Sequence, residues 1–204
     1  MNLKTRLDGH FVACSAVAAA AAMGGMAQNS EAAIVYSGVV NLTIPASTNG
    51  LYINVVNGMI NEPGNTGGAT VPGWDLNLWG SSSLSFFNPS TPSGGVYYTG
   101  GGTTVSVLAG GETIDGSGTW GSSNTQWNPT ATGIVGFRFQ NELTSQVHYG
   151  WGRIVNNGSS DRQLVEYAYE DAAGVGIVAG AIPTPGSAAL LAVGAAGLVG
   201  RRRR

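Results

Sequence analysis

The chain has 204 residues, of which 33 are glycine and only 10% are charged. Its length suits one domain with terminal segments, and the lack of glycine at every third position excludes a collagen-like chain. Residues 34 to 182 contain three basic and nine acidic side chains. They therefore offer no basic patch for phosphates, and we expect no nucleic-acid binding.

Residues 1 to 33 have the features of an export signal. Lys4 and Arg6 form a basic start, an alanine-rich apolar stretch follows from 11 to 23, and small residues come next. The single cysteine, Cys14, lies inside this segment, so the exported part would have neither thiols nor disulfides. We predict a signal helix that a signal peptidase removes. A soluble alanine-rich helix is the alternative.

Residues 34 to 182 are predicted to form one all-β domain. Runs rich in β-branched and aromatic residues alternate with turns rich in Gly, Asn, Ser and Pro, and no window shows the apolar spacing of a helix. An Asn49-Gly50 turn after Pro45 would join the first two strands. This spacing favours an antiparallel β-sandwich, of which a jelly roll is one form. The predicted strands are 34–44, 51–56, 74–79, 83–87, 96–99, 103–109, 134–139, 146–155 and 163–170.

No catalytic constellation is recognisable in this domain. His148 is the only histidine beyond the signal segment, and no G-x-S-x-G elbow occurs, so a serine hydrolase would lack its parts. We expect His148 to be a strand residue beside aromatic neighbours. Glu166 and Glu170 would share one strand face roughly 13 Å apart, beyond the ~5 to 9.5 Å that glycosidases need. We therefore expect these two carboxylates to form a solvated face, and expect no enzyme activity.

Calcium is the metal that the sequence supports best. Residues 75 to 80 copy the D-x-N-x-x-G start of a calcium-binding loop, beginning with Asp75. However, Trp79 occupies a ligand position, and Phe86 stands where the loop needs a bidentate glutamate. The alternation of polar and apolar residues instead predicts a strand, so we expect no metal and no cofactor.

A carbohydrate-binding site is the remaining functional candidate. Sugar sites stack the apolar face of a pyranose on exposed aromatic rings, while polar groups bond its hydroxyls. Trp120 and Trp127 lie in a stretch rich in Gly, Ser, Asn and Thr that is typical of a long loop, and Tyr97 and Tyr98 shortly precede three glycines. These four residues are the candidate sugar contacts. Loop tryptophans that fold back and cap a sandwich are the alternative.

The last 22 residues carry the most specific pattern of the chain. As a helix, their uncharged run would be about 22 Å long, shorter than the ~30 Å hydrocarbon core of a bilayer. The terminal arginines would hold this end in the cytoplasm and place the domain outside. The parts are, in order, Pro183, Thr184, Pro185, the uncharged run 186–200, and Arg201, Arg202, Arg203 and Arg204.

This tail resembles the PEP-CTERM sorting signal of bacteria, in which a Pro-Glu-Pro motif precedes a short transmembrane helix and an arginine-rich end. Pro183 and Pro185 match the motif, and Thr184 stands in place of the usual glutamate. The resemblance implies recognition by an exosortase, a membrane peptidase. It also implies release or transfer to the cell surface, alongside exopolysaccharide. A plain tail anchor that stays in the inner membrane is the alternative.

These features divide the chain into a signal peptide (1–33), a β domain (34–182) and a sorting or anchor segment (183–204). They predict a non-enzymatic exported protein of the cell surface or extracellular matrix. Its expected partners are signal peptidase and an exosortase during export, the membrane before processing, and exopolysaccharide. A lectin-like module that binds exopolysaccharide and an extracellular carbohydrate-active enzyme are the two alternatives.

Overall fold

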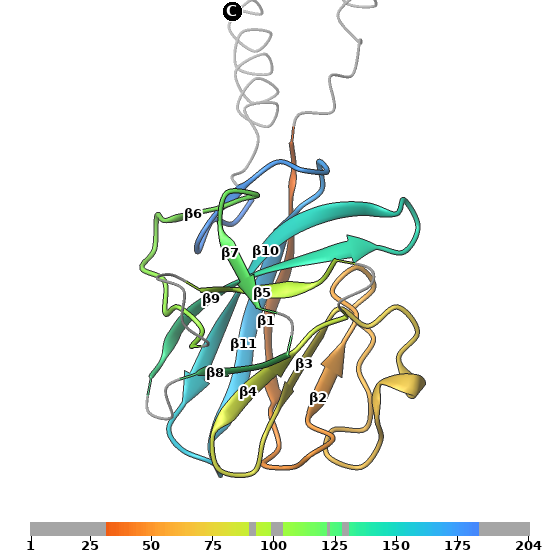
Figure 1. Ribbon diagram of the computed structural model, residues 1–204, viewed down its shortest axis with the longest axis vertical. Coiled ribbons are helices and arrows are strands. Elements are labelled where there is room, and N and C mark those ends of the chain that lie inside the picture. The colour runs from red at the N-terminus through yellow and green to blue at the C-terminus, as the bar shows by residue number, and fades with distance from the viewer. Residues whose placement is uncertain (1–31, 90–92, 99–103, 122, 128–130, 184–204) are drawn as a thin grey trace, which may run out of the picture. The chain divides into compact units, whose positions relative to one another are not determined.

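The computed structural model describes residues 32–89, 93–98, 104–121, 123–127 and 131–183 (Figure 1). Most of the predicted signal segment and the predicted tail after Pro183 lie outside these residues. The described chain forms antiparallel strands and one short 3-10 helix, η1 (Gly68–Thr70), which confirms the predicted all-β class. No helix in this part is long and apolar enough to cross a membrane. The strands are β1 (Ile34–Thr43), β2 (Leu51–Ile53), β3 (Leu76–Trp79), β4 (Leu84–Phe87), β5 (Gly95–Tyr98), β6 (Thr113–Ile114), β7 (Thr119–Gly121), β8 (Ser123–Trp127), β9 (Gly133–Asn141), β10 (Gln146–Asn156), β11 (Arg162–Glu170) and β12 (Ile177–Val178).

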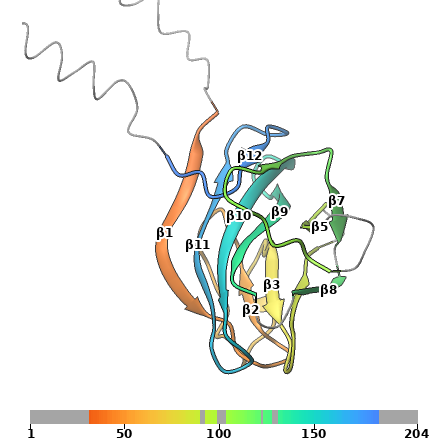
Figure 2. The ribbon, with the colours of Figure 1, turned by 90° about the vertical axis from the view of Figure 1, so that its left-hand side faces the viewer.

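These strands form two larger sheets and a small ribbon. The first sheet has six strands in the order β1-β11-β10-β9-β5-β7, and the second has four in the order β2-β3-β4-β8. The ribbon consists of β6 and β12. Figure 2 shows β1, β11, β10 and β9 following one another across the molecule. The centre of the six-stranded sheet is therefore built from the longest strands of the C-terminal half.

One hydrophobic cluster joins the six-stranded and four-stranded sheets. Alternate residues of β9 face this cluster, and Val135, Phe137 and Phe139 are each at most 2% exposed. Period-two alternation makes such a segment a strand, and burial of its apolar face stabilises the sheet. The four-stranded sheet contributes Leu51, Ile53, Leu76, Leu78, Leu84, Phe86 and Trp127.

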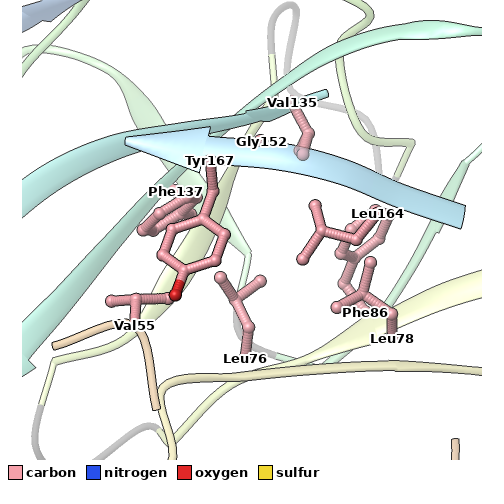
Figure 3. Close-up of a pocket in the computed structure, with 9 residues that line it drawn as sticks. All are labelled: Val55, Leu76, Leu78, Phe86, Val135, Phe137, Gly152, Leu164 and Tyr167. Carbon is pink, nitrogen blue, oxygen red and sulfur yellow. The ribbon is translucent and has the colours of Figure 1, made fainter. Parts of the chain in front are cut away.

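A small apolar cavity remains inside this cluster (Figure 3). Its volume is about 10 Å³, at the lower limit for a single water molecule. Its lining comes from both sheets and includes Leu76, Phe86, Gly152 and Leu164. The cavity is too small for a ligand, but it leaves the neighbouring side chains room to adjust.

The opposite face of the six-stranded sheet is also covered. Trp151 of β10 is 0% exposed there, and its Nε1 donates to the carbonyl oxygen of Ala181 at 2.9 Å. Ile114 of β6, Ile177 of β12 and Ala179 pack in the same cluster. The chain that follows β11 therefore returns over the sheet and covers part of β10 and β11 on this face.

Arg162, the first residue of β11, is a buried cation that donates to two backbone carbonyl groups. It is 2% exposed, and it donates from Nη1 to Gly80 O at 2.7 Å and from Nη2 to Ser82 O at 2.9 Å. Burial lowers the pKa of this guanidinium. The two bonds tie the turn between β3 and β4 to the six-stranded sheet.

Three local predictions are wrong. β1 and β2 do not form a hairpin across Asn49-Gly50, because β1 pairs with β11 and β2 pairs with β3. Of the described residues 104–109, Leu108 forms only an isolated bridge to Ile134. The stretch predicted as a long loop contains β7 and β8. In the first and third cases, pairing with a distant strand outweighs local propensity.

Candidate functional site

The predicted sugar contacts Tyr97 and Trp120 lie side by side on β5 and β7. They are register partners, and their ring centroids are 5.4 Å apart in an edge contact. Both side chains are half-buried. Gly118 permits this packing, because a Cβ there would lie 2.0 Å from Tyr97 Cε2. Both rings also pack against a hydrophobic cluster on this face of the sheet, so the sheet edge carries two adjoining, partly exposed aromatic rings.

Arg138 and Tyr149, which sequence reasoning missed, complete this group, which we call the aromatic corner. They are cross-strand partners on β9 and β10. Arg138 Cζ lies 5.2 Å from the centroid of the Trp120 ring, and the Tyr149 ring lies 5.8 Å from it. Alternation within one strand does not reveal which strand is its neighbour, so the sequence held no signal for this grouping.

Two donors in the aromatic corner lack acceptors. Nε of Arg138 and Nε1 of Trp120 are buried and form no hydrogen bond with described residues. Arg138 also forms no ion pair within the described chain; the ion pair found there joins Arg153 to Glu166. A cation–π contact contributes about 0.5–1 kcal/mol at an exposed site and leaves the positive charge in place. The corner therefore combines aromatic rings with an unpaired cation.

Trp127 and Tyr98 do not join the aromatic corner. Trp127 is 0% exposed, its Nε1 donates to Ala131 O at 2.6 Å, and its ring lies 6.1 Å from Phe86 in the core. A fully buried ring has no face for a sugar, so Trp127 is not a sugar contact in this structure. Tyr98 is half-buried and follows Tyr97 directly on β5, so the two side chains point to opposite faces.

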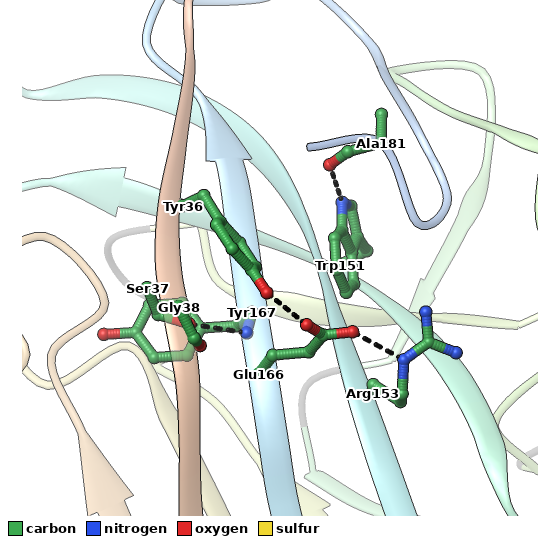
Figure 4. A network of polar contacts seen from close by, with 8 residues as sticks. All are labelled: Tyr36, Ser37, Gly38, Trp151, Arg153, Glu166, Tyr167 and Ala181. Atoms are coloured by element: carbon green, nitrogen blue, oxygen red, sulfur yellow. Dashed lines mark hydrogen bonds and ion pairs between the residues drawn. The ribbon is translucent and has the colours of Figure 1, made fainter. Parts of the chain in front are cut away.

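Glu166 lies in a polar network rather than on a solvated face, which corrects the sequence prediction (Figure 4). Its Oε1 accepts from Arg153 Nε at 2.6 Å, and its Oε2 accepts from the hydroxyl of Tyr36. Burial raises the pKa of the Glu166 carboxyl, but the hydrogen bonds from Arg153 and Tyr36 outweigh it, so that the pKa is lowered overall. Arg153 also lies over the Trp151 ring, at 5.8 Å from its centroid.

Glu170 is also not part of a solvated face. It is 5% exposed, and burial raises the pKa of its carboxyl. His148 lies beside it at 3% exposure, with Nδ1 at 2.8 Å from the carbonyl oxygen of Glu170. The His148 ring stacks on Phe139 at 5.5 Å, which confirms the strand position with aromatic neighbours.

Asp75, the first residue of the predicted calcium motif, bonds to the backbone. It is 4% exposed, and its Oδ2 accepts from Val55 N at 2.8 Å. Burial raises the pKa of Asp75 to about 8; the bond from Val55 opposes this rise, and the charge of Glu142 adds to it. Asn54 Nδ2 donates to Glu142 Oε1 at 2.6 Å. In the part of the chain that the structure describes, no three Cys, His, Asp or Glu side chains lie close enough to hold a metal ion.

No family model, curated protein or solved structure matches this chain. The aromatic corner is therefore interpreted from its own geometry. It lies at the β7 edge of the six-stranded sheet and brings together two of the four predicted sugar contacts.

Proposed function

We propose that this protein is exported and delivered to the cell surface or extracellular matrix through its C-terminal signal, and that it acts there without catalysis. The observation that carries this proposal is the order of the tail: Pro-Thr-Pro, an uncharged run and four arginines. Its likeness to the PEP-CTERM signal makes an exosortase the expected processing partner. The short uncharged run, about 22 Å as a helix, suits a removable signal better than a permanent span.

The β domain supports this proposal because its described contacts extend as far as Ala181, shortly before the tail. Trp151 donates to the carbonyl of Ala181, and Ala179 is 2% exposed within its cluster. Pro183 is exposed, and the rest of the motif lies outside the described residues. Cleavage beyond Pro183 would remove no described strand. We further propose that the two larger sheets form a β-sandwich, since they share one hydrophobic cluster.

The sorting proposal is tested by the mass of the protein recovered from the cell surface. We expect a mature chain that lacks the terminal arginines. Replacing Pro183 and Pro185 by alanine should keep the precursor intact in the membrane fraction. Thr184→Glu is the matched control, because it restores the usual motif and should preserve processing. A mature protein that still ends in Arg204 and stays in the membrane fraction would favour a plain membrane anchor.

Carbohydrate binding is a second candidate, favoured by the half-buried rings of Tyr97 and Trp120 in the aromatic corner. Aromatic side chains with one open face are the usual platform for the apolar face of a sugar. A surface protein deposited beside exopolysaccharide would meet such a ligand at high concentration. Binding there would retain the protein in the matrix after its tail is removed.

If this second function is correct, Trp120→Ala should weaken binding of the purified full-length chain to exopolysaccharide about tenfold or more. Trp74→Ala is the matched control, because Trp74 is also half-buried but packs elsewhere, against Tyr52 and Phe87. Isothermal titration calorimetry provides the affinities, and thermal unfolding verifies that both variants are folded. If Trp120→Ala and the wild type bound exopolysaccharide with equal affinity, the aromatic corner would be excluded as the binding site.

A further inference from the structure

Two arginines on one face of the six-stranded sheet differ in their charge partners. Arg138 and Arg153 each lie over a tryptophan ring, at 5.2 Å from the centroid of Trp120 and 5.8 Å from that of Trp151. Arg153 is neutralised by Glu166, whose Oε1 lies 2.6 Å from its Nε. Arg138 has no such partner among the described residues. Among the described residues, Arg153 therefore has a counter-ion and Arg138 has none, although both lie over a tryptophan ring.

Arg138 also differs from the third arginine of the described chain. Arg162 donates to two carbonyl oxygens, whereas Arg138 donates no hydrogen bond to a described residue. Arg138 is half-buried beside the half-buried ring of Trp120, and of its guanidinium nitrogens only Nε is a buried atom without a partner. Their planar fork matches a carboxylate or sulfate group, which can accept two parallel hydrogen bonds.

We infer that the aromatic corner binds an anionic pyranose, with the sugar ring on Tyr97 and Trp120 and its carboxylate or sulfate on Arg138. This inference rests on the proposed carbohydrate-binding function and adds the charge of the ligand. The recognition is local: residues 34 to 182 hold three arginines, no lysine and nine acids, so the domain as a whole repels an anionic polymer. Because charges farther apart than ~8 Å are largely screened at physiological ionic strength, one unpaired arginine can still select an anion that touches it.

The test compares a galacturonate oligosaccharide with its fully methyl-esterified form, which has the same ring without the charge. We expect the wild-type full-length chain to bind the acid about tenfold or more tightly than the ester. Arg138→Gln should remove this preference, and Arg138→Lys should restore part of it. Arg153→Gln is the matched control and should keep the preference, because Arg153 is already neutralised. Dextran sulfate and unmodified dextran form a second pair that distinguishes sulfate from carboxylate.

The outcomes distinguish the inference about the charge of the ligand from the proposal that the aromatic corner binds carbohydrate. A preference for dextran sulfate over dextran that depends on Arg138, without one for the galacturonate, supports the inference with sulfate as the anion. Equal binding of charged and neutral forms overturns the inference about charge and leaves carbohydrate binding intact. Absence of binding to all four probes overturns both. A preference that survives in Arg138→Gln and is lost in Arg153→Gln would also overturn the assignment to Arg138.

Discussion

Gly150→Ala is expected to destabilise the protein by about 3 kcal/mol or more, at the upper end of overpacking effects. A Cβ at Gly150 would lie 2.4 Å from Cζ of the Phe137 ring and 2.7 Å from the backbone oxygen of Ala168. The Ala168 oxygen is a backbone atom within the neighbouring strand β11, so it cannot retreat without disturbing the sheet. Denaturant unfolding, followed by tryptophan fluorescence, measures the loss.

Gly152→Ala is the matched control, two residues along the same strand. Its Cβ would meet Leu164 Cδ1 at 3.1 Å and Val135 Cγ1 at 3.6 Å, both side chains that line the small cavity (Figure 3). Leu164 can move into that space. We therefore expect a change between zero and a gain of about 1 kcal/mol, because alanine restricts the unfolded chain. If both variants lost the same free energy of unfolding, the core at Gly152 would be shown to have no room for the added methyl group.

Asp75→Asn is expected to remove a pH dependence of stability between about pH 4 and pH 8. The folded-state pKa of about 8 lies above the ordinary value of 3.8, so the folded protein holds the Asp75 proton more tightly than the unfolded chain does. The resulting stabilisation is complete below pH 4 and is lost as the pH rises to 8. Since one pKa unit corresponds to about 1.4 kcal/mol, the loss should be roughly 2 to 5 kcal/mol. Asparagine stays neutral and can still accept from Val55 N.

The measurement is the free energy of unfolding of wild type and variant at each pH, and the difference between them isolates Asp75 from other titrating groups. Glu142→Gln is the companion variant, because it removes the neighbouring charge that contributes to the raised pKa of Asp75. In this variant, the pH range over which stability is lost should end at a lower pH. Parallel curves for wild type and Asp75→Asn from pH 4 to pH 8 would refute this account of the buried carboxyl.

The strands themselves were largely predictable because their signals are local. In residues 146–155, polar and apolar residues alternate without proline, and the segment lies within β10. Residues 163–170 are rich in apolar and aromatic side chains, also lack proline, and lie within β11. A period of two and the choice of turn residues are properties of a few neighbouring positions, so sequence alone determines them. The order of motifs in the C-terminal tail is equally a linear property.

What each side chain faces was decided only by tertiary structure. Trp120 and Trp127 lie seven positions apart in one polar stretch, yet Trp120 contacts Tyr97 at a sheet edge and Trp127 is enclosed in the core. Glu170 was expected on a solvated face, but it is buried in a sheet whose outer face the chain after β11 covers.

The sequence by itself determined the all-β class, most strand positions and the pattern of the tail. Tertiary structure alone decided which faces are covered, and it placed Arg138 beside Trp120 with no counter-ion among the described residues. The physical reason is that alternation is a short-range property, whereas burial and charge pairing depend on strands far apart in the chain. A different strand register, or a different segment covering the sheet, would change the contacts of each side chain while the local sequence pattern stayed the same.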